Sequence, residues 1–429
     1  MMSVQHFFTI IFFAAVAAVT TPTTAAEHDM HDHKHGNKHD GHGHDHKHDA
    51  KAGKPAHDMN KMWADMRAKK VGMAVSIAAD EKGKLWLVRM QDGHIRVSHS
   101  VDDGKHFSDG VVVNPQPEAI LAEGQSRPKI AVRNGVIAVT WVQALPKVFA
   151  GNIRFARSID GGLTFSSPVT VNDDQGETSH GFSALTLGDG GRVSLVWFDG
   201  RVRDAADKAG QKYVGSAVYY AVSEDGGANF SANRKLADHA CECCKIGMTL
   251  DADGVPVVFW RHVFEDSIRD FALARLDAQA KVIRASDDGW KIDACPHHGG
   301  DIAVDEAGGR HLVWFTGNTE NPGLFYRRME GDKMTAPHAF GDLDSQPNNP
   351  AVFAGGKQVY LVWREFDGTH YRLMTSVSVD RGDHWSAARS VATTSGAADL
   401  PIFVNGAHKP LVAWNSANEG VRLFEIGGN

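Results

Sequence analysis

Ser158-Ile-Asp160-Gly-Gly162-Leu-Thr-Phe165 is the stretch of sequence that decides the fold of this chain. The same pattern, Ser-x-Asp-x-Gly-x-x followed by Phe or Trp, occurs at residues 100–107, 158–165, 223–230 and 378–385. Asp bonds readily to nearby backbone N–H groups, and Gly adopts a positive φ without a steric cost, so both residues favour tight turns. The pattern therefore predicts four copies of one turn.

A second repeat connects these turns. Strand-like apolar runs that carry a tryptophan recur seven times at intervals of about fifty residues, at Trp86, Trp141, Trp197, Trp260, Trp314, Trp363 and Trp414. Most of them follow another apolar run and a polar loop, and four strands per repeat at this period are typical of a propeller. We therefore predict an all-β propeller of four-stranded blades over residues 66–429, with seven blades and six as the alternative. The last unit lacks a fourth strand, and we expect the segment before Val71 to close the ring there.

The four turns resemble the Asp boxes, or BNR repeats, of sialidase-like β-propellers. In that family the Asp box joins the third and fourth strands of a blade, its aromatic residue packs between blades, and it lies on the face opposite the usual ligand site. The resemblance implies structural roles for Asp102, Asp160, Asp225 and Asp380. Sialidases of this type usually have six blades, whereas seven units are counted here.

All four cysteines lie in two short clusters, Cys241-Glu-Cys243-Cys244 and Cys295-Pro-His297-His298. Each cluster precedes the innermost strand of its unit, and these strands are expected to begin near Ile246 and Asp301. In a propeller, the segments that lead into the inner strands share one face with the loops between the second and third strands. We therefore expect the two clusters to meet on the ligand face, from adjacent blades.

Thiolates and imidazoles within reach of one another suit Zn²⁺, and they suit Cu(I) better where sulfur predominates. With Met248 nearby, we favour copper over zinc. His180, at the equivalent point of the third unit, and His262, after Trp260, are possible further ligands. Disulfides, such as Cys295 with Cys241 or Cys243, are the alternative, and one disulfide beside a His-rich metal site also remains open.

The N-terminus predicts export. An apolar run followed by small residues indicates a signal peptide over residues 1–26, and hence a periplasmic or a secreted protein. Residues 27–65 have no apolar periodicity, so we predict a disordered metal-binding arm and linker. Its histidines are His28, His31, His33, His35, His39, His42, His44, His46 and His48.

These features predict a periplasmic metal-binding propeller that stores, delivers or detoxifies copper, with a metal transporter or chaperone as a possible partner. The net charge of −7 and the lack of a basic stripe argue against nucleic acid, and no later segment is long enough to span a membrane. The alternative, implied by the family resemblance, is an exo-α-sialidase-like hydrolase acting on anionic sugars. The residues that it would use are Arg127, Asp199, Arg201, Arg364, Glu365 and Tyr371. A purely scaffolding propeller is the third possibility.

Overall fold

The computed structural model describes residues 72–122, 124–174 and 176–427. The predicted signal peptide, the histidine-rich arm and the segment before Val71 lie outside the described residues. None of the helices within the described ranges is long and apolar enough to cross a membrane.

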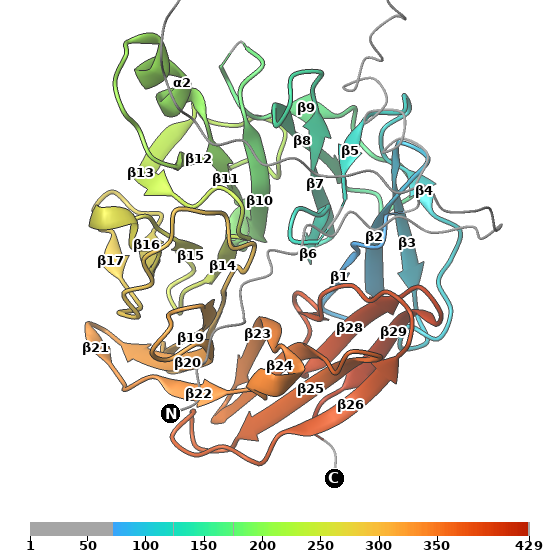
Figure 1. The fold of residues 1–429 in the computed structure, drawn as a ribbon. Coiled ribbons are helices and arrows are strands. Elements are labelled where there is room, and N and C mark those ends of the chain that lie inside the picture. Colours follow the sequence, from blue (N-terminus) through green and yellow to red (C-terminus); the bar gives the residue numbers. More distant parts are fainter. Residues whose placement is uncertain (1–71, 123, 175, 428–429) are drawn as a thin grey trace, which may run out of the picture. The chain divides into compact units, whose positions relative to one another are not determined.

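Seven antiparallel sheets, here called blades 1 to 7, follow one another around a ring (Figure 1). Blade 1 comprises β1 (Ser76–Ala79), β2 (Leu85–Gln91), β3 (His94–Ser100) and β4 (Val111–Val112). Blade 2 comprises β5 (Ile120–Leu121), β6 (Lys129–Arg133), β7 (Val136–Ala144), β8 (Gly151–Ser158) and β9 (Val169–Thr170). Blade 3 comprises β10 (His180–Leu187), β11 (Val193–Asp199), β12 (Ser216–Ser223) and β13 (Arg234–Ala240), and helix α2 (Arg201–Lys208) joins β11 to β12.

Blade 4 comprises β14 (Gly247–Leu250), β15 (Pro256–Arg261), β16 (Phe271–Arg275) and β17 (Ile283–Arg284). Blade 5 comprises β18 (Asp301–Val304), β19 (Arg310–Thr316), β20 (Gly323–Glu330), β21 (Lys333–Met334) and β22 (His338–Phe340). Blade 6 comprises β23 (Asn348–Gly355), β24 (Gln358–Phe366), β25 (Tyr371–Ser378) and β26 (Arg389–Thr394). Blade 7 has three strands, β27 (Ile402–Phe403), β28 (Leu411–Ser416) and β29 (Gly420–Glu425). The prediction of a seven-bladed all-β propeller is confirmed.

Six of the seven repeat tryptophans form the same contact in their blades. Trp141, Trp197, Trp260, Trp314, Trp363 and Trp414 lie on the second strand of their blades with no exposed surface. Each indole N–H donates to an acceptor near the end of its blade, as Trp363 does to Glu365 at 2.7 Å. Burying these side chains contributes to the apolar core between blades, and the paired N–H removes the desolvation cost of the polar atom.

Trp86 differs from the other six. It is the second residue of β2, whereas Trp141 is the sixth of β7, so the two positions are not equivalent. Its ring instead lies under the turn of blade 2, where a Cβ on Gly162 would come within 2.5 Å of it. The count of seven was right for the blades, but the Trp repeat itself has six members.

The Ser-x-Asp-x-Gly turns join the third and fourth strands of blades 1, 2, 3 and 6. In blade 2, Ser158 Oγ donates to Asp160 at 2.7 Å and accepts from Gly162 N at 2.9 Å, and the Asp160 carboxylate accepts from the Thr164 side chain and backbone. These hydrogen bonds, that of the Thr164 side chain first, lower the pKa of Asp160 to about 2. The carboxylate therefore caps its own turn, in the structural role expected for it.

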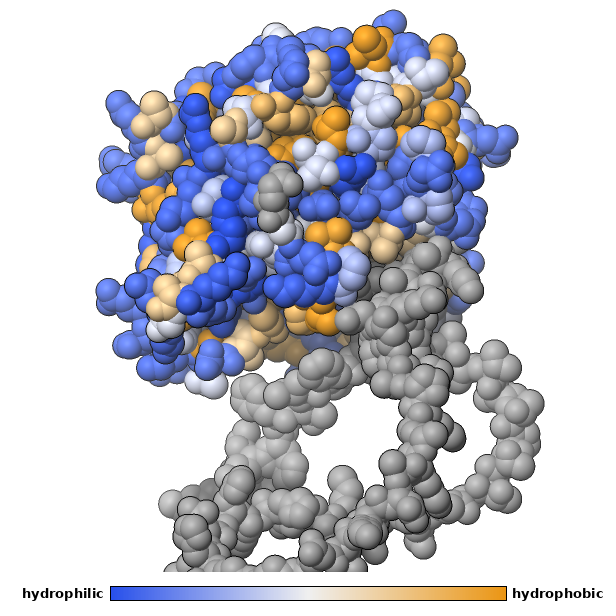
Figure 2. Space-filling view, turned by 90° about the horizontal axis from the view of Figure 1, so that it is seen from above, coloured by the Kyte–Doolittle hydropathy of each residue, from blue (hydrophilic) through white to orange (hydrophobic). Residues whose placement is uncertain are grey.

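Blade 7 closes the ring against blade 1 through backbone bonds. Ala79 N donates to Asn405 O at 2.7 Å, and Asn405 N donates to Ile77 O at 3.0 Å. Asn415 Nδ2 adds a bond to Met73 O at 2.7 Å. On the side of the propeller shown in Figure 2, hydrophilic residues surround only small hydrophobic patches, as is usual for a solvent-facing surface.

Candidate functional site

The segments that lead into the inner strands lie together on one face of the ring, here called the site face. Gln125, before β6, connects four blades on this face. Its Nε2 donates to His297 O at 3.0 Å and to Asn349 Oδ1 at 2.7 Å, and its Oε1 accepts from Lys245 N at 2.6 Å and Gly299 N at 3.0 Å. The expected meeting of loops from different blades is therefore present, with a glutamine at its centre.

A cavity of about 160 Å³ lies at the centre of the ring, and its lining includes inner-strand residues of all seven blades. Three of its charged side chains are Lys129, Lys245 and Asp301. Lys245 pairs with Asp301 at 3.4 Å. Lys129 is half-buried; burial, followed by the nearby charges of Arg127 and Lys245, lowers its pKa to about 7. The cavity thus has a positive bias.

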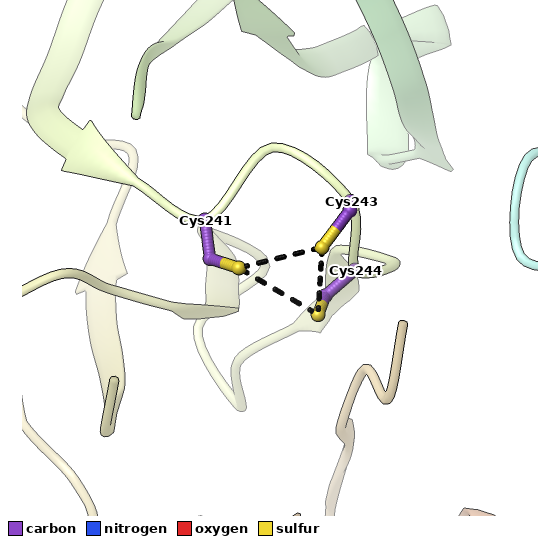
Figure 3. Close-up of side chains that lie close together, drawn as sticks. All are labelled: Cys241, Cys243 and Cys244. Atoms are coloured by element: carbon purple, nitrogen blue, oxygen red, sulfur yellow. Dashed lines mark hydrogen bonds between the residues drawn. The ribbon is translucent and has the colours of Figure 1, made fainter. Parts of the chain in front are cut away.

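Cys241, Cys243 and Cys244 bring their sulfur atoms together (Figure 3). The Sγ–Sγ distances are 3.5 Å for Cys241–Cys243, 4.0 Å for Cys241–Cys244 and 3.9 Å for Cys243–Cys244. The exposed fractions of the three residues are 0, 5 and 0 %. The intervening Glu242 side chain bonds to Arg203 and Ser216, which orients it away from the sulfurs. This alternation explains why Cys-Glu-Cys-Cys can present three thiols to one point.

The fourth cysteine comes from the neighbouring segment. Cys295 is exposed, and it lies outside the trio whose sulfurs are all within 4.8 Å of one another. The segments that carry the two clusters are joined through Gln125 Oε1, which accepts from Lys245 N and Gly299 N. The two cysteine clusters therefore come together from adjacent blades. All four cysteines belong to the described residues, and none is joined in a disulfide there.

Arg269 supplies the positive charge beside the thiols. This buried residue donates from Nη1 to Cys241 Sγ at 3.0 Å and from Nε to Ile292 O at 2.8 Å. Hydrogen bonds with Cys243 and the other thiols, together with the Arg269 charge, hold the pKa of Cys241 far below its usual range. Burial raises the pKa of Cys244 to about 12. The contact with Arg269 therefore favours the thiolate form of Cys241.

The four histidines that were expected to join the thiols have other contacts. His298 stacks on Phe315 with ring centroids 4.1 Å apart, and burial lowers its pKa to about 3. His262 accepts from Trp260 at 3.4 Å, and burial lowers its pKa to about 4. His297 is exposed, and only its backbone carbonyl is used, by Gln125.

His180 belongs to a separate cluster with two carboxylates. Its Nδ1 contacts Gly151 O at 2.6 Å, and its Nε2 lies 3.0 Å from Asp174 and 3.4 Å from Asp199. Burial opposes a charge on this ring, but the two carboxylates outweigh it and raise the pKa of His180 to about 9. The His180 ring therefore belongs to a His/Asp cluster whose ligand atoms lie within 4.8 Å of one another, and not to the thiol cluster.

The arginines and acids of the sialidase alternative are mostly used to hold the fold. Arg127 forms a bidentate pair with Asp399 at 2.7 and 2.9 Å, and its side chain is 2 % exposed. Arg201 bonds to Asp173 and Asp199, and Asp199 accepts from Trp197. Glu365 is buried and accepts from Trp363 and from Asp342 N. These contacts give Arg127, Asp199 and Glu365 buried partners within the fold, whereas the Arg201 side chain remains 22 % exposed.

Arg364 is the exception among the expected arginines. It is half-buried, with Nε donating to Asn348 at 3.1 Å and Nη1 to Ala398 O at 2.7 Å, above the Tyr371 ring at 4.9 Å. No carboxylate pairs with it among the residues that the structure describes. Burial lowers its pKa. This guanidinium therefore carries an unneutralised charge on the site face.

Four residues of this face were not predicted from the sequence: Gln125, Lys129, Phe149 and Arg269. Phe149, on the loop between β7 and β8, is 87 % exposed and has a φ of +64°. An exposed aromatic with a left-handed backbone is unusual for a side chain without a function. Gln125, Lys129 and Arg269 are recognised only through neighbours distant in sequence, and the apolar sequence around Phe149 gave no signal that its side chain is exposed.

No protein-family model matches the chain, and no curated protein matches it. Solved structures do share its fold. An ulvan lyase of the PL25 polysaccharide lyases, bound to GlcA(1-4)Rha3S, matches with a TM-score of 0.55 and 11 % identity over 84 % of this chain and 94 % of that one. The BP39L lectin from Burkholderia pseudomallei matches with a TM-score of 0.54 and 12 % identity over 85 % and 97 %. At this identity the likeness defines the class of protein, a seven-bladed β-propeller.

These comparisons correct one expectation. The prediction of a metal-storage, delivery or detoxification protein is wrong, because the solved propellers that share the fold are a polysaccharide lyase and a lectin. The site agrees with this correction. Storage and delivery require an ion that exchanges with solvent or a partner, whereas the three clustered thiols are closed off at 0 to 5 % exposure.

Proposed function

We propose that this chain is a carbohydrate-active propeller that binds and processes an acidic glycan on its site face. The observation that carries the proposal is the unpaired guanidinium of Arg364. A partly buried cation without a counter-ion is costly, and a carboxylate or sulfate on a ligand would neutralise it. Guanidinium binds both groups through paired N–H donors, and Nη2 of Arg364 has no partner among the described residues.

The surroundings of Arg364 support an anionic ligand. Burial lowers the pKa of Arg364; Tyr371 and the more distant Asp399 carboxylate oppose this effect, and the positive charge of Arg127 adds to it. The cavity beneath contributes Lys129 as a further cation without a carboxylate within 4 Å in the described part of the chain. The sugar part of the ligand has apolar partners in Tyr371 on this blade and in exposed Phe149 on blade 2.

The fold neighbours support the same class of ligand. The ulvan lyase complex contains a uronate and a sulfated sugar, and the lectin is a sugar-binding propeller. The four turns that resemble Asp boxes point to the same class of ligand, because the sialidase-like propellers that carry such turns also act on anionic sugars. An acidic polysaccharide lies outside the cytoplasm, which agrees with the export predicted from residues 1–26.

We assign the chemistry to Arg364 and Tyr371. Arg364 would hold the acidic group, and the phenol of Tyr371, whose ring centre lies 4.9 Å from the guanidinium, would serve as the proton-transfer group. The tyrosine, aspartate and three-arginine arrangement of a sialidase is not assembled, since Arg127 and Arg201 are paired within the fold. The substrate is therefore an acidic glycan other than a sialoside.

The test measures binding and cleavage with a panel of glycans. Sulfated and unsulfated uronate polysaccharides, a sialoside and neutral arabinan are compared by calorimetry, by the ultraviolet absorbance of unsaturated uronate and by new reducing ends. Arg364→Gln is expected to weaken binding of the acidic glycan by about tenfold to a hundredfold, the loss of a charged hydrogen bond. Arg389→Gln is the matched control, because this arginine is exposed on β26 and its side chain forms no ion pair with the residues that the structure describes.

Three outcomes contradict the proposal or a part of it. Equal binding of neutral and acidic glycans would show that the unpaired cation does not select the ligand. Binding that survives Arg364→Gln would place the site elsewhere. Tight binding without any cleavage, unchanged in Tyr371→Phe, would make the protein a lectin and remove the catalytic assignment.

A further inference from the structure

The three clustered sulfurs have the spacing of a metal site. A Zn–S bond is about 2.3 Å long, so the edge of a regular ZnS₄ tetrahedron is about 3.8 Å. The three Sγ–Sγ distances of 3.5, 3.9 and 4.0 Å bracket this edge. A disulfide requires about 2.05 Å. The trio is therefore arranged as one face of a tetrahedron and not as a cystine.

We propose that Cys241, Cys243, Cys244 and Cys295 bind one structural Zn²⁺. The ion joins the segment before β14 to the segment before β18, and so fixes blade 4 to blade 5 at the site face. Four sulfur ligands in tetrahedral geometry are typical of closed structural zinc sites. The ion is a resident part of the fold, and the inference does not depend on the glycan proposal.

The cluster contains only sulfur, because among the described residues no histidine nitrogen joins the group of ligand atoms within 4.8 Å of one another at this site. His298 stacks on Phe315, His262 accepts from Trp260, and His180 lies between two carboxylates. Cys295 provides the fourth corner. It is exposed and lies outside the trio whose sulfurs are within 4.8 Å of one another, on a segment joined to theirs through Gln125, so a movement of its loop would bring its sulfur to the open side of the buried trio.

Arg269 completes the site from outside the ligand shell. Four thiolates around Zn²⁺ leave two excess negative charges, and such sites are stabilised by outer N–H donors to sulfur. Arg269 Nη1 already donates to Cys241 Sγ at 3.0 Å, and its Nε holds Ile292 O in the segment that carries Cys295. One guanidinium therefore neutralises part of the charge and positions the neighbouring loop.

The test uses Co²⁺ as a spectroscopic substitute for Zn²⁺ in the full chain, kept under reductant. Thiolate ligands give Co²⁺ an intense ultraviolet charge-transfer band that imidazole does not give, so the histidines of residues 27–65 do not mask the result. We expect one equivalent with this band, displaced by Zn²⁺. Cys243→Ser should abolish it, and Cys295→Ser, at an exposed position that cannot disrupt the core, should weaken the affinity at least tenfold. His297→Gln is the matched control and should change nothing.

Several results would overturn the inference. The reduced wild-type protein could lack a thiolate band, which would mean that the sulfurs do not bind the metal. A band that shifts in His297→Gln relative to the wild type would mean that this histidine is a ligand. Cys241 linked to Cys243 by a disulfide in protein isolated from its own compartment would mean that the cysteines are clamps. Isolation with Cu(I) and without zinc would refute the choice of metal. None of these measurements involves a glycan, so the failure of either proposal is recognised separately.

Discussion

The pair of Arg127 and Asp399 is predicted to act as a clasp that closes the ring, and not as a substrate-binding group. Arg127 lies before β6 of blade 2, and Asp399 lies before β27 of blade 7. Their side chains are 2 and 3 % exposed. Arg127 also donates to Val75 O at 2.9 Å in front of blade 1 and to Gly124 O at 2.6 and 3.0 Å. One guanidinium thus connects blades 7, 1 and 2 at the point where the ring closes.

The expected losses follow from burial. Arg127→Met leaves the Asp399 carboxylate buried without its partner, and Asp399→Leu leaves a buried cation, so each variant should lose about 3–5 kcal/mol of unfolding free energy. A domain of about 350 residues has an unfolding entropy near 0.7 kcal/mol/K, which converts this loss to a fall in Tm of about 4–7 °C. The double variant has no unpaired charge. Its unfolding free energy should fall by only about 1–2 kcal/mol, because the carbonyls of Val75 and Gly124 still lack the donor that Arg127 supplied.

The unfolding free energies of the wild type, the two single variants and the double variant form a double-mutant cycle, which is measured by calorimetry and by urea unfolding. Arg133→Met, which breaks the exposed pair with Asp189, is the control and should cost less than about 1 kcal/mol. Losses below 1 kcal/mol in both single variants, or a double variant that is as unstable as the sum of the two, would refute the clasp. Loss of glycan binding in Arg127→Met with unchanged stability would return Arg127 to the sialidase role.

Two further predictions concern the turn of blade 2 and the central cavity. Gly161 and Gly162 both have a positive φ, but only a Cβ on Gly162 would contact Trp86, at 2.5 Å. In urea unfolding, Gly161→Ala should therefore lower the unfolding free energy by about 1 kcal/mol, the cost of the backbone conformation alone. Gly162→Ala should lower it by about 1–3 kcal/mol more, because the added methyl group also meets Trp86. Equal losses would show that the turn does not pack on blade 1. The folded pKa of Lys129 is about 7, and its unfolded pKa is about 10.4, so the unfolded chain binds more protons between these values and stability should rise with pH there. The rise is at most about 4.6 kcal/mol, and it is smaller where the cavity hydrates the ammonium. Lys129→Met should be more stable than the wild type at pH 7 and should lose this rise in unfolding measured at pH 7 and 9; an unchanged slope would show that Lys129 keeps its proton in the folded protein.

The outcome for the cysteines shows how far topology can be used from sequence. Cys241 and Cys295 precede inner strands of adjacent blades. Because strand direction determines which face a loop lies on, this placement was sufficient to predict that their loops lie together. Which side chains complete the site could not be predicted this way. Whether His298 points to sulfur or to Phe315 depends on side-chain packing across blades, which no local pattern records.

The arginines show the same limit. Arg127, Arg201, Arg261 and Arg364 all follow or precede strands on the same face, and nothing in their sequence neighbourhoods separates them. Their partners are remote in sequence: Arg127 bonds to Asp399, while Arg261 donates to His298 O and Phe315 O and stacks on Phe271. Only the folded ring shows that Arg364 has no carboxylate partner among the described residues.

The amino-acid sequence by itself determined the repeat, the number of blades and the turns, because period, apolar patterning and glycine placement are local and recur along the chain. It also determined which loops share a face, through the alternation of strand direction. The tertiary structure alone decided which charges are neutralised and which sulfurs converge. The neutralisation of charges and the convergence of sulfurs both depend on side chains that the fold brings together from segments far apart in sequence. Their burial and the distances between them decide whether such groups form a structural pair or a site.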